Sequence, residues 1–375
     1  MEGLTYFEEM ASELNNPEIQ AWKQAGNRVV GTSCSNIPEE VLHAAGLLPI
    51  RLRAPGIKET GMADSHLHRI NCTYTRSVLE FLLRGELDFF DGFIVTNTCD
   101  HHLRLVSELE DKSDIPFFHY FQMYHTLGEG AREWLLLEME KMIGHIEESF
   151  GIKISEKDLR QTISVYNRTR RLMARLNELR KVDPPPLSGA EYLRIVLTGM
   201  STPRESFNDR LEALLPELEE RRSGEAGQPR LLVIGGACDS PDFIDFIESK
   251  GASIVADGLC FGLRHYQGII DEEAEDPLSA IADRYLGRVP CPSIIDGFDH
   301  GYAILRDIIS QWEVQGVVSA RLKFCDHWAG GCKMLKDAIK QDNGLPMLDL
   351  EREYSTTESG QISTRVQAFL ELLKG

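Results

Sequence analysis

The sequence predicts an α/β protein with two doubly wound parallel-sheet domains joined by a helical section. Short β-rich runs alternate with helical patterns in the first and last parts of the chain, which is typical of parallel sheets. Long amphipathic helical patterns lie between them. The 375 residues, 42% of them hydrophobic, are enough to bury more than one core. We place an N-terminal α/β domain at residues 1–150, the helical section at residues 151–227 and a C-terminal α/β domain at residues 228–375.

The N-terminal domain is predicted to contain four strands. They are the runs RVVGTSC (28–34), LLPIRLR (47–53), FDGFIVTNT (90–98) and PFFHYFQM (116–123). A helix is expected after Pro38, because proline suits the first helical turn and Glu39 and Glu40 suit the positive end of the helix dipole. A second helix is expected after Cys72, where the run TYTRSVLEFLLRG has apolar residues at helical spacing.

The helical section and the C-terminal domain follow from the same patterns. The runs WLLLEMEKMIGHIEESF and LRQTISVYNRTRRLMARLNELR predict two long helices, and two more are expected after the proline run at 184–186. Alternation resumes in PRLLVIGGACDS, SIVADG, VQGVVSARLKF and LPMLDLE. These four runs predict a second parallel sheet.

The charge and hydropathy of the chain exclude several classes of partner. Fifty-nine acidic against forty basic residues give a formal net charge of -19, which repels nucleic acid and anionic membranes. No run approaches the roughly 18–20 apolar residues of a membrane span. The acidic first residues do not resemble a signal peptide. We therefore expect a cytoplasmic protein that binds neither nucleic acid nor a membrane.

Two Cys-Asp-His triplets form a weak internal repeat. Cys99-Asp100-His101 follows the strand run FIVTNT, and Cys325-Asp326-His327 follows the strand run GVVSARLKF. Each triplet leads into a helical pattern and then into a strand marked by proline. In open α/β sheets, ligands bind beyond the carboxyl ends of the strands. Both triplets therefore occupy positions where such folds place their chemistry.

Three cysteines are candidate iron ligands. Backbone N–H groups and the helix dipole stabilise a thiolate at the start of a helix, and Cys72, Cys99 and Cys325 each precede a predicted helix. Three such thiolates from separate elements are able to hold three irons of a 4Fe-4S cluster and leave the fourth iron open to water or substrate. The alternative for any one of them is a buried core residue, which is the commoner role of a lone cysteine.

The other five cysteines divide into two groups. Cys34 also ends a predicted strand, so it is the first candidate for an additional ligand. Cys238, Cys260, Cys291 and Cys332 are expected to be buried core residues. No C-x-x-C pair occurs, so any cluster must be assembled from distant segments.

Glycine motifs give no support for nucleotide binding. Gly235-Gly236 follows a strand but lacks the G-x-G-x-x-G pattern, and it is expected to allow close packing of strand and helix. No G-x-x-x-x-G-K-[ST] motif occurs, so this chain is not expected to hydrolyse ATP itself.

Five polar residues near the predicted sheet ends are weaker candidates for ligand binding or catalysis. His101, His102 and His327 are expected to be solvated rather than ligands or proton donors. Arg51 and Arg53 follow a strand run and would suit a carboxylate or phosphate, although exposed arginines usually bind neither.

Several segments resemble the benzoyl-CoA reductase and 2-hydroxyacyl-CoA dehydratase family. They are PEEVLHAAGLLPIRLR, NCTYTRSVLE, TNTCDHH, LKFCDHW and LEREYSTTESGQISTRVQAFLE, and the resemblance runs nearly from end to end. Their order and spacing are similar to those of the smaller cluster-bearing subunit of the catalytic component, and most similar to the benzoyl-CoA reductase branch.

The resemblance implies two α/β domains with a helical part and a 4Fe-4S cluster whose ligands correspond to Cys72, Cys99 and Cys325. It also implies two partners, a homologous sister cluster subunit and a separate ATP-hydrolysing iron–sulfur activator that delivers single electrons at low potential. The missing P-loop motif agrees with a separate activator. The extra cysteines, notably Cys34, leave open a relative of another kind, the double-cubane cluster proteins, which bind a larger linked cluster.

Three functions compete on this basis. The first is ATP-dependent reduction of an aromatic acyl-CoA such as benzoyl-CoA, an oxidoreductase function in anaerobic aromatic degradation. The second is radical dehydration of a 2-hydroxyacyl-CoA, a lyase reaction that reuses the injected electron. The third is a double-cubane cluster reductase or a non-catalytic electron-transfer subunit. The sequence leaves open which acyl-CoA is bound, which subunit of the hetero-oligomer holds it and which residues donate protons.

Overall fold

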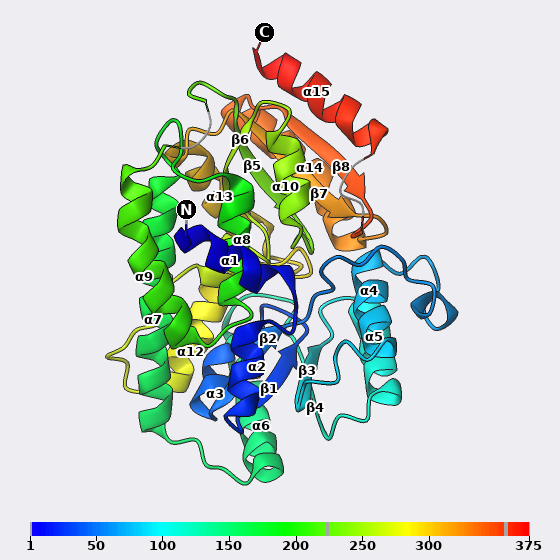
Figure 1. The fold of residues 1–375 in the computed structure, drawn as a ribbon, viewed down its shortest axis with the longest axis vertical. Coiled ribbons are helices and arrows are strands. Elements are labelled where there is room, and N and C mark those ends of the chain that lie inside the picture. Colours follow the sequence, from blue (N-terminus) through cyan, green and yellow to red (C-terminus); the bar gives the residue numbers. More distant parts are fainter. Residues whose placement is uncertain (1, 223–224, 356–358, 375) are drawn as a thin grey trace.

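The computed structural model describes residues 2–222, 225–355 and 359–374, and it contains two four-stranded parallel sheets (Figure 1). The strands of the N-terminal sheet are β1 (Arg28–Thr32), β2 (Leu47–Arg51), β3 (Gly92–Thr96) and β4 (Phe117–Phe121). Those of the C-terminal sheet are β5 (Arg230–Gly235), β6 (Ser253–Asp257), β7 (Gly316–Leu322) and β8 (Met347–Arg352). Each strand lies within one residue of a predicted run, so the predicted α/β class with two parallel-sheet domains is confirmed.

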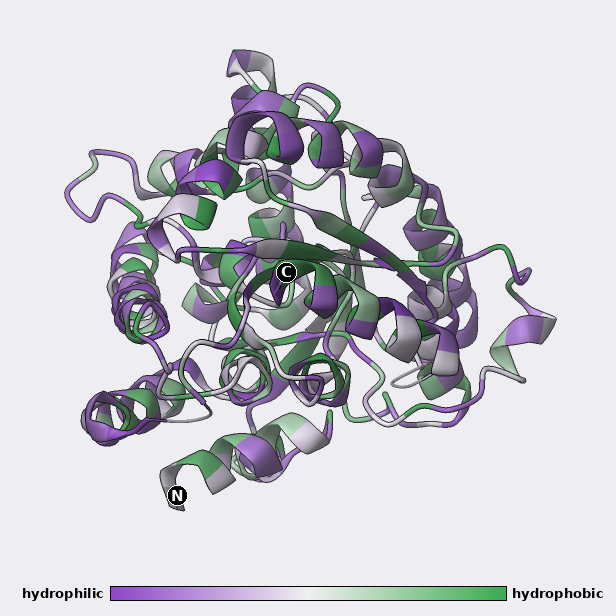
Figure 2. Ribbon diagram, turned by 90° about the horizontal axis from the view of Figure 1, so that it is seen from above, coloured by the Kyte–Doolittle hydropathy of each residue, from purple (hydrophilic) through white to green (hydrophobic). Residues whose placement is uncertain are grey.

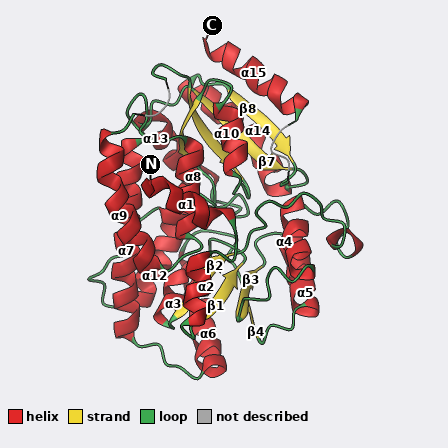
Figure 3. Ribbon diagram, in the orientation of Figure 1, coloured by secondary structure: helices red, strands yellow, loops and turns green. Residues whose placement is uncertain are grey.

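Helices surround both sheets (Figure 3). The N-terminal part contains α1 (Glu2–Ser12), α2 (Pro17–Gln24), α3 (Glu39–Ala44), the 3-10 helix η1 (Ala63–Ser65), α4 (Thr73–Leu83) and α5 (Asp100–Lys112). The middle of the chain contains α6 (Glu129–Phe150), α7 (Glu156–Leu179), α8 (Gly189–Gly199) and α9 (Arg204–Glu220). The C-terminal part contains α10 (Pro241–Glu248), α11 (Leu263–Tyr266), α12 (Pro277–Gly287), α13 (Phe298–Gln311), α14 (Asp326–Asn343) and α15 (Gly360–Lys374).

Both sheets have the same strand order, β2-β1-β3-β4 and β6-β5-β7-β8. The first strand of each sheet in the chain is central, and it pairs with the second strand on one side and the third on the other. The strand order therefore reverses between β1 and β3 and again between β5 and β7. Such reversals open a crevice at the carboxyl ends of the strands, which is where doubly wound folds bind ligands.

The helical middle of the chain contacts both α/β parts. The long helices α7 and α9 pack together along one flank of the molecule (Figure 1). α7 also packs against α3, and α12 packs against both α6 and α7. Seen from above in Figure 2, hydrophobic residues gather on the central strands, and the surrounding helices carry both hydrophobic and hydrophilic residues. Within the described ranges, no helix combines the length and apolar character needed to cross a membrane.

A buried ion-pair network, the α3 network, joins α3 to the helical section and to α12. Glu40 pairs with Arg170 of α7, and Glu39 pairs with Arg204 of α9 at 2.7 Å. The Tyr285 hydroxyl of α12 donates to Glu40 at 2.9 Å. Burial raises the pKa of Glu40, but neighbouring arginines, Arg170 first, outweigh burial and lower it to about 2. The two glutamates expected to serve the helix dipole are therefore also the anions of a buried network.

Candidate functional site

The three predicted iron ligands each lie directly before a helix. Cys72, Cys99 and Cys325 occupy the N-cap positions of α4, α5 and α14. Cys99 follows β3 and Cys325 follows β7, beside the two reversals of strand order. None of the three side chains makes a capping hydrogen bond. Backbone N–H groups in the first turn of each helix nevertheless offset part of the rise in thiol pKa that burial causes, from Thr75 for Cys72, His102 for Cys99 and Trp328 for Cys325.

These three thiols interact electrostatically although they are far apart in the sequence. Burial raises the pKa of Cys99, and the nearby thiols of Cys72 and Cys325 raise it further. Burial likewise raises the pKa of Cys325 to about 12, with Cys72 among the contributing groups. Crowded thiols stay protonated in the absence of a cation, whereas a bound metal deprotonates its thiol ligands.

The turn before Cys325 has an unusual backbone conformation. Phe324 has a φ of 66°, in the left-handed region that favours glycine. Such a conformation costs about 1–3 kcal/mol for a bulky residue, and the ring is 39% exposed, so core burial does not compensate. The backbone N–H of Cys325 donates to the Leu322 carbonyl at 3.1 Å and closes the turn. Strain of this kind is common where a functional side chain must be held in place.

Three further cysteines converge on the same region. Cys34 follows β1, Cys260 follows β6, and Cys291 lies in the loop before α13. Cys291 contributes to the raised pKa of Cys99, Cys325 and Cys260. Cys34 also contributes to the raised pKa of Cys260. We call Cys72, Cys99 and Cys325 the first thiol set, and Cys34, Cys260 and Cys291 the second thiol set.

Cys260 and Cys291 were expected to be buried core residues, but both are partly exposed and pack at the edge of a core. Cys260 comes three residues after β6, so the strand-end rule that selected the other candidates would have found it. Cys291 has no such signal apart from its Pro-Cys-Pro context. Its loop is held by the segment after β4, where the His125 carbonyl accepts the backbone N–H of Ile295 at 2.8 Å and the His125 ring contacts the Ser293 carbonyl at 3.2 Å.

A buried arginine without a partner faces the second thiol set. Arg51 ends β2 and is only 3% exposed, which corrects the expectation of an exposed arginine. Its Nε and Nη1 make no hydrogen bond to any described residue, and its guanidinium lies 5.0 Å from the centre of the Phe261 ring. Burial raises the pKa of Cys34, but Arg51 and nearby hydrogen-bond donors outweigh burial and lower it overall. Arg51 acts on Cys260 as well.

The three histidines near the first thiol set have different environments. The backbone N–H of Cys72 donates to Nδ1 of His101 at 3.2 Å, so His101 links the start of α5 to α4. His102 is buried beside Tyr74, and burial is the main reason that its pKa falls to about 3. The expectation of a solvated His102 is therefore wrong, because this residue faces α4 rather than solvent. His327 is exposed, as expected.

The remaining cysteines and the glycine pair have packing roles. Cys238 is fully buried, and the Cys332 thiol on α14 lies 3.9 Å from Oγ of Ser319. A Cβ at Gly235 would lie 2.5 Å from the carbonyl oxygen of Ala320, so only glycine allows this approach of β5 and β7. The close approach at this glycine is therefore between two strands, whereas the sequence predicted close packing of a strand and a helix.

A single metal ion and an iron–sulfur cluster make different demands on the spacing of their ligands. Among the described residues, no three His, Cys, Asp or Glu side chains are close enough together to hold one ion. A cluster does not require this, because each thiolate binds a different iron. The unpartnered N–H groups of Arg51 also fit, since hydrogen bonds to cluster sulfurs are a normal part of such sites.

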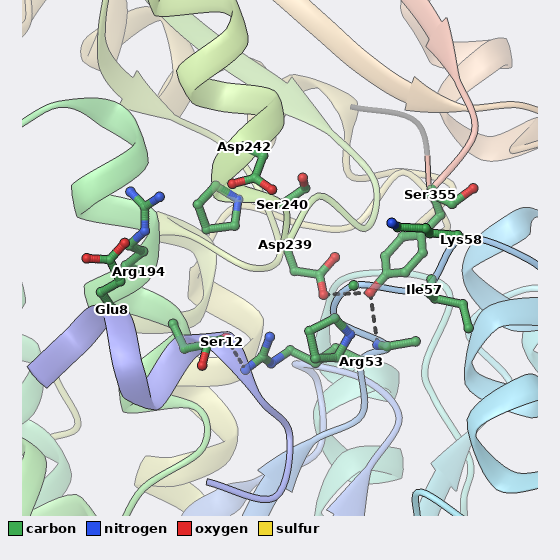
Figure 4. Close-up of a pocket in the computed structure, with 16 residues that line it drawn as sticks. Glu8, Ser12, Arg53, Ile57, Lys58, Arg194, Asp239, Ser240, Asp242 and Ser355 are labelled. Atoms are coloured by element: carbon green, nitrogen blue, oxygen red, sulfur yellow. Dashed lines mark hydrogen bonds between the residues drawn. The ribbon is translucent and has the colours of Figure 1, made fainter. Parts of the chain in front are cut away.

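A separate polar cavity of about 380 Å³ lies among α1, the loop after β2 and the loop after β5 (Figure 4). Arg53 was expected to be exposed, but it is fully buried. Its Nη2 donates to the Ala11 carbonyl at 2.7 Å. The Tyr354 hydroxyl donates to Asp239 at 2.6 Å and accepts the backbone N–H of Ala54 at 3.0 Å. These bonds join four segments that are distant in the sequence. The described lining carries charges of both signs and no cysteine, so we assign this cavity a structural role.

The protein has two parallel sheets of the same topology. A cysteine lies beside the reversal of strand order in each sheet, Cys99 in the first and Cys325 in the second. These features define a class of α/β proteins with two similar sheets and cysteines at corresponding positions. Residues 34–373 match the family described as 2-hydroxyglutaryl-CoA dehydratase, D-component. The chain belongs to this family. The matched segment begins at Cys34 and includes both thiol sets. The family relationship indicated by the sequence is confirmed.

Individual relatives are similar over nearly their whole length. The chain is 30% identical to the "Putative dehydratase subunit YjiM" of Escherichia coli, with 94% of this chain and 93% of that protein covered. It is 22% identical to the (R)-phenyllactyl-CoA dehydratase beta subunit of Clostridium sporogenes, covering 98% of both chains. It is 23% identical to a benzoyl-CoA reductase subunit of Thauera aromatica, covering 98% of this chain and 97% of that protein. The chain is therefore related to dehydratase and reductase subunits alike.

Proposed function

We propose that this chain is the iron–sulfur subunit of an ATP-dependent aromatic acyl-CoA reductase of the benzoyl-CoA reductase type. The first thiol set would hold the 4Fe-4S cluster, and the second thiol set would extend it to a linked, double-cubane cluster. The observation that supports this proposal is the position of Cys72, Cys99 and Cys325 at the starts of three helices, with three further cysteines in electrostatic interaction with them or with one another.

A larger cluster favours a reductase over a dehydratase. Reduction of an aromatic ring consumes two electrons and two protons for each thioester, whereas dehydration returns its electron at the end of each turnover. When bound, the cluster would supply low-potential electron storage. The chain's own part would be to hold the thiols at strand ends and to exclude water, since Cys34 and Cys72 are each only 7% exposed. A site able to store more than one electron suits the reaction that consumes two.

The electrons require an external source. This chain carries no P-loop motif, so we propose a separate ATP-hydrolysing iron–sulfur activator as one partner. Several relatives are named as subunits of larger enzymes, which supports a homologous sister cluster subunit as the other partner. The assembled complex would act on an acyl-CoA thioester.

Iron and acid-labile sulfide analysis of anaerobically purified protein tests the cluster. We expect about eight irons per chain, which corresponds to two linked four-iron units. About four irons would restrict the cluster to the first thiol set. A colourless, metal-free chain in an active complex would contradict the whole assignment.

The second candidate function is 2-hydroxyacyl-CoA dehydratase. It is favoured by the names of relatives in Clostridium sporogenes, Acidaminococcus fermentans and Anaerotignum propionicum, which are dehydratase beta subunits. Counting electrons separates the two functions. A reductase consumes donor in proportion to product, whereas a dehydratase forms many products for each electron supplied.

A further inference from the structure

The polar cavity of Figure 4 contains charged groups that the bonds between its four segments do not use. Its lining has three cationic and three anionic side chains, which are Arg53, Lys58 and Arg194, and Glu8, Asp239 and Asp242. Figure 4 shows Arg53 and Asp239 near the centre of the lining, with Glu8 and Arg194 to one side and Lys58 to the other. The lining is therefore balanced in charge.

Arg53 and Asp239 are the two deeply buried charges of this lining, at 1% and 5% exposed. Nη2 of Arg53 donates to the carbonyls of Ala11 and Glu13 at 2.7 and 3.2 Å, and Asp239 accepts from the Tyr354 hydroxyl. Nε of Arg53 is buried and makes no hydrogen bond to any described residue. Arg53 and Asp239 form no ion pair with each other, although both line the cavity.

Each of these two charges is only partly compensated by the other. Burial raises the pKa of Asp239, and the charge of Arg53 offsets only part of this effect. Burial likewise lowers the pKa of Arg53, and Asp239 offsets only part of that effect. A buried charge is costly unless a partner stabilises it. A ligand in contact with both side chains would supply the missing partners.

The size and charge of the cavity limit what this ligand can be. Ligand pockets usually measure about 300–1,000 Å³, so a cavity of about 380 Å³ is large enough for a small molecule. Asp239 would repel an anion and Arg53 would repel a cation, because both charges line the same small space. A molecule that carries an ammonium and a carboxylate close together avoids both repulsions. Ala11, Pro55 and Ile57 also line the cavity and provide apolar contacts for an aliphatic side chain.

We propose that this cavity binds a small aliphatic α-amino acid as a zwitterion. The carboxylate of the amino acid accepts from Nε of Arg53, and its ammonium donates to Asp239. The ligand thereby joins the loop after β2 to the loop after β5 and adds to the structural role of the cavity. This site is separate from the proposed cluster, because no cysteine is among the described lining residues.

Titration calorimetry on the anaerobically purified complex of this chain with its native partner subunits tests the site. The probes are L-alanine and L-leucine, and we expect at least one of them to bind. The methyl ester and the N-acetyl derivative of the better binder should each bind about ten- to hundredfold more weakly, because each lacks one of the two charges that the site recognises.

Asp239→Asn tests the ammonium contact in the protein. Asparagine is still able to accept from Tyr354, so the fold should be retained, and the better binder should bind at least about tenfold more weakly. Asp245→Asn is the matched control, because Asp245 lies on α10, loses the same charge and does not line the cavity. It should leave the affinity unchanged.

Three outcomes would overturn the proposal. The first is that neither amino acid binds the unmodified complex, and the second is that either derivative binds as tightly as its parent amino acid. The third is an unchanged affinity in folded Asp239→Asn. The two derivatives require no change in the protein, so they test the proposal even if Asp239→Asn does not fold. Iron content does not enter these measurements, so the cavity and the proposed cluster are tested separately.

Discussion

Two buried groups of arginines in this protein differ in what they bind. Arg170 and Arg204 each pair with a carboxylate in the α3 network. Arg51 and Arg264 are equally buried, but neither pairs with a carboxylate within the described chain. Their positive charges instead lower the pKa of thiols in the second set, Arg51 that of Cys34 and both arginines that of Cys260.

Under the proposed function, the α3 network holds the fold, whereas Arg51 and Arg264 are available to a bound group. An unpaired buried charge is costly, so a folded chain tolerates it where another group supplies the missing partner. Thiolates and sulfides of an iron–sulfur cluster carry negative charge and accept hydrogen bonds. The α3 network needs no such group, because its anions belong to the chain.

The largest effect is expected from removing a thiol of the first set. Cys99→Ala and Cys325→Ala should each lose at least the four irons of the first unit and all activity, because a four-iron unit held by three thiolates has no spare protein ligand. Circular dichroism should stay near that of the unmodified chain, since the α3 network and both cores are untouched. Full iron content and activity in Cys325→Ala would refute the role of the C-terminal sheet in the site.

Removing a thiol of the second set should have a smaller effect. Cys291→Ser should lose about half of the iron, if each thiol set holds one four-iron unit. Cys332→Ser is the control, because the Cys332 thiol of α14 lies near Ser319 of β7 and belongs to neither thiol set, so this variant should leave the iron content unchanged. Equal iron content in Cys291→Ser and Cys332→Ser would show that Cys291 is a packing residue, as the sequence predicted.

Breaking the α3 network should lower the free energy of unfolding and leave the iron content unchanged. Arg170→Ala should lower the free energy of unfolding by about 3–5 kcal/mol, because it leaves Glu40 buried without its partner. Arg168→Ala on the same helix removes an exposed pair with Glu212 and should cost at most about 1 kcal/mol. Urea unfolding of the metal-free chain measures both values, and a similar small cost for both would show that the network does not hold the fold.

The smallest effect is expected at Arg51. Arg51→Gln should lower a cluster reduction potential by roughly 50 mV, because a positive charge and its hydrogen bonds stabilise the reduced state. Arg51→Lys keeps the charge and should shift the potential less. A redox titration followed by electron paramagnetic resonance measures this directly. An unchanged potential with normal iron would mean that Arg51 does not face the cluster.

The sequence by itself determined the elements of the fold and the first thiol set. Strand and helix patterns are local, and all eight strand runs are present as strands. Cys72, Cys99 and Cys325 could be selected because each precedes a helix, and a helix start is readable from a few neighbouring residues. The family relationship rested on the same segments and is confirmed.

Only the tertiary structure decided the second thiol set and its arginines. Cys291 lies in a loop without periodic pattern, and its position depends on hydrogen bonds to His125, which is far away in the sequence. Arg51 ends a strand and was expected to be exposed, but it is buried with its guanidinium beside Phe261, which is far away in the sequence. Burial and convergence are properties of distant segments brought together, so no local pattern encodes them, whereas secondary structure depends mainly on neighbours along the chain.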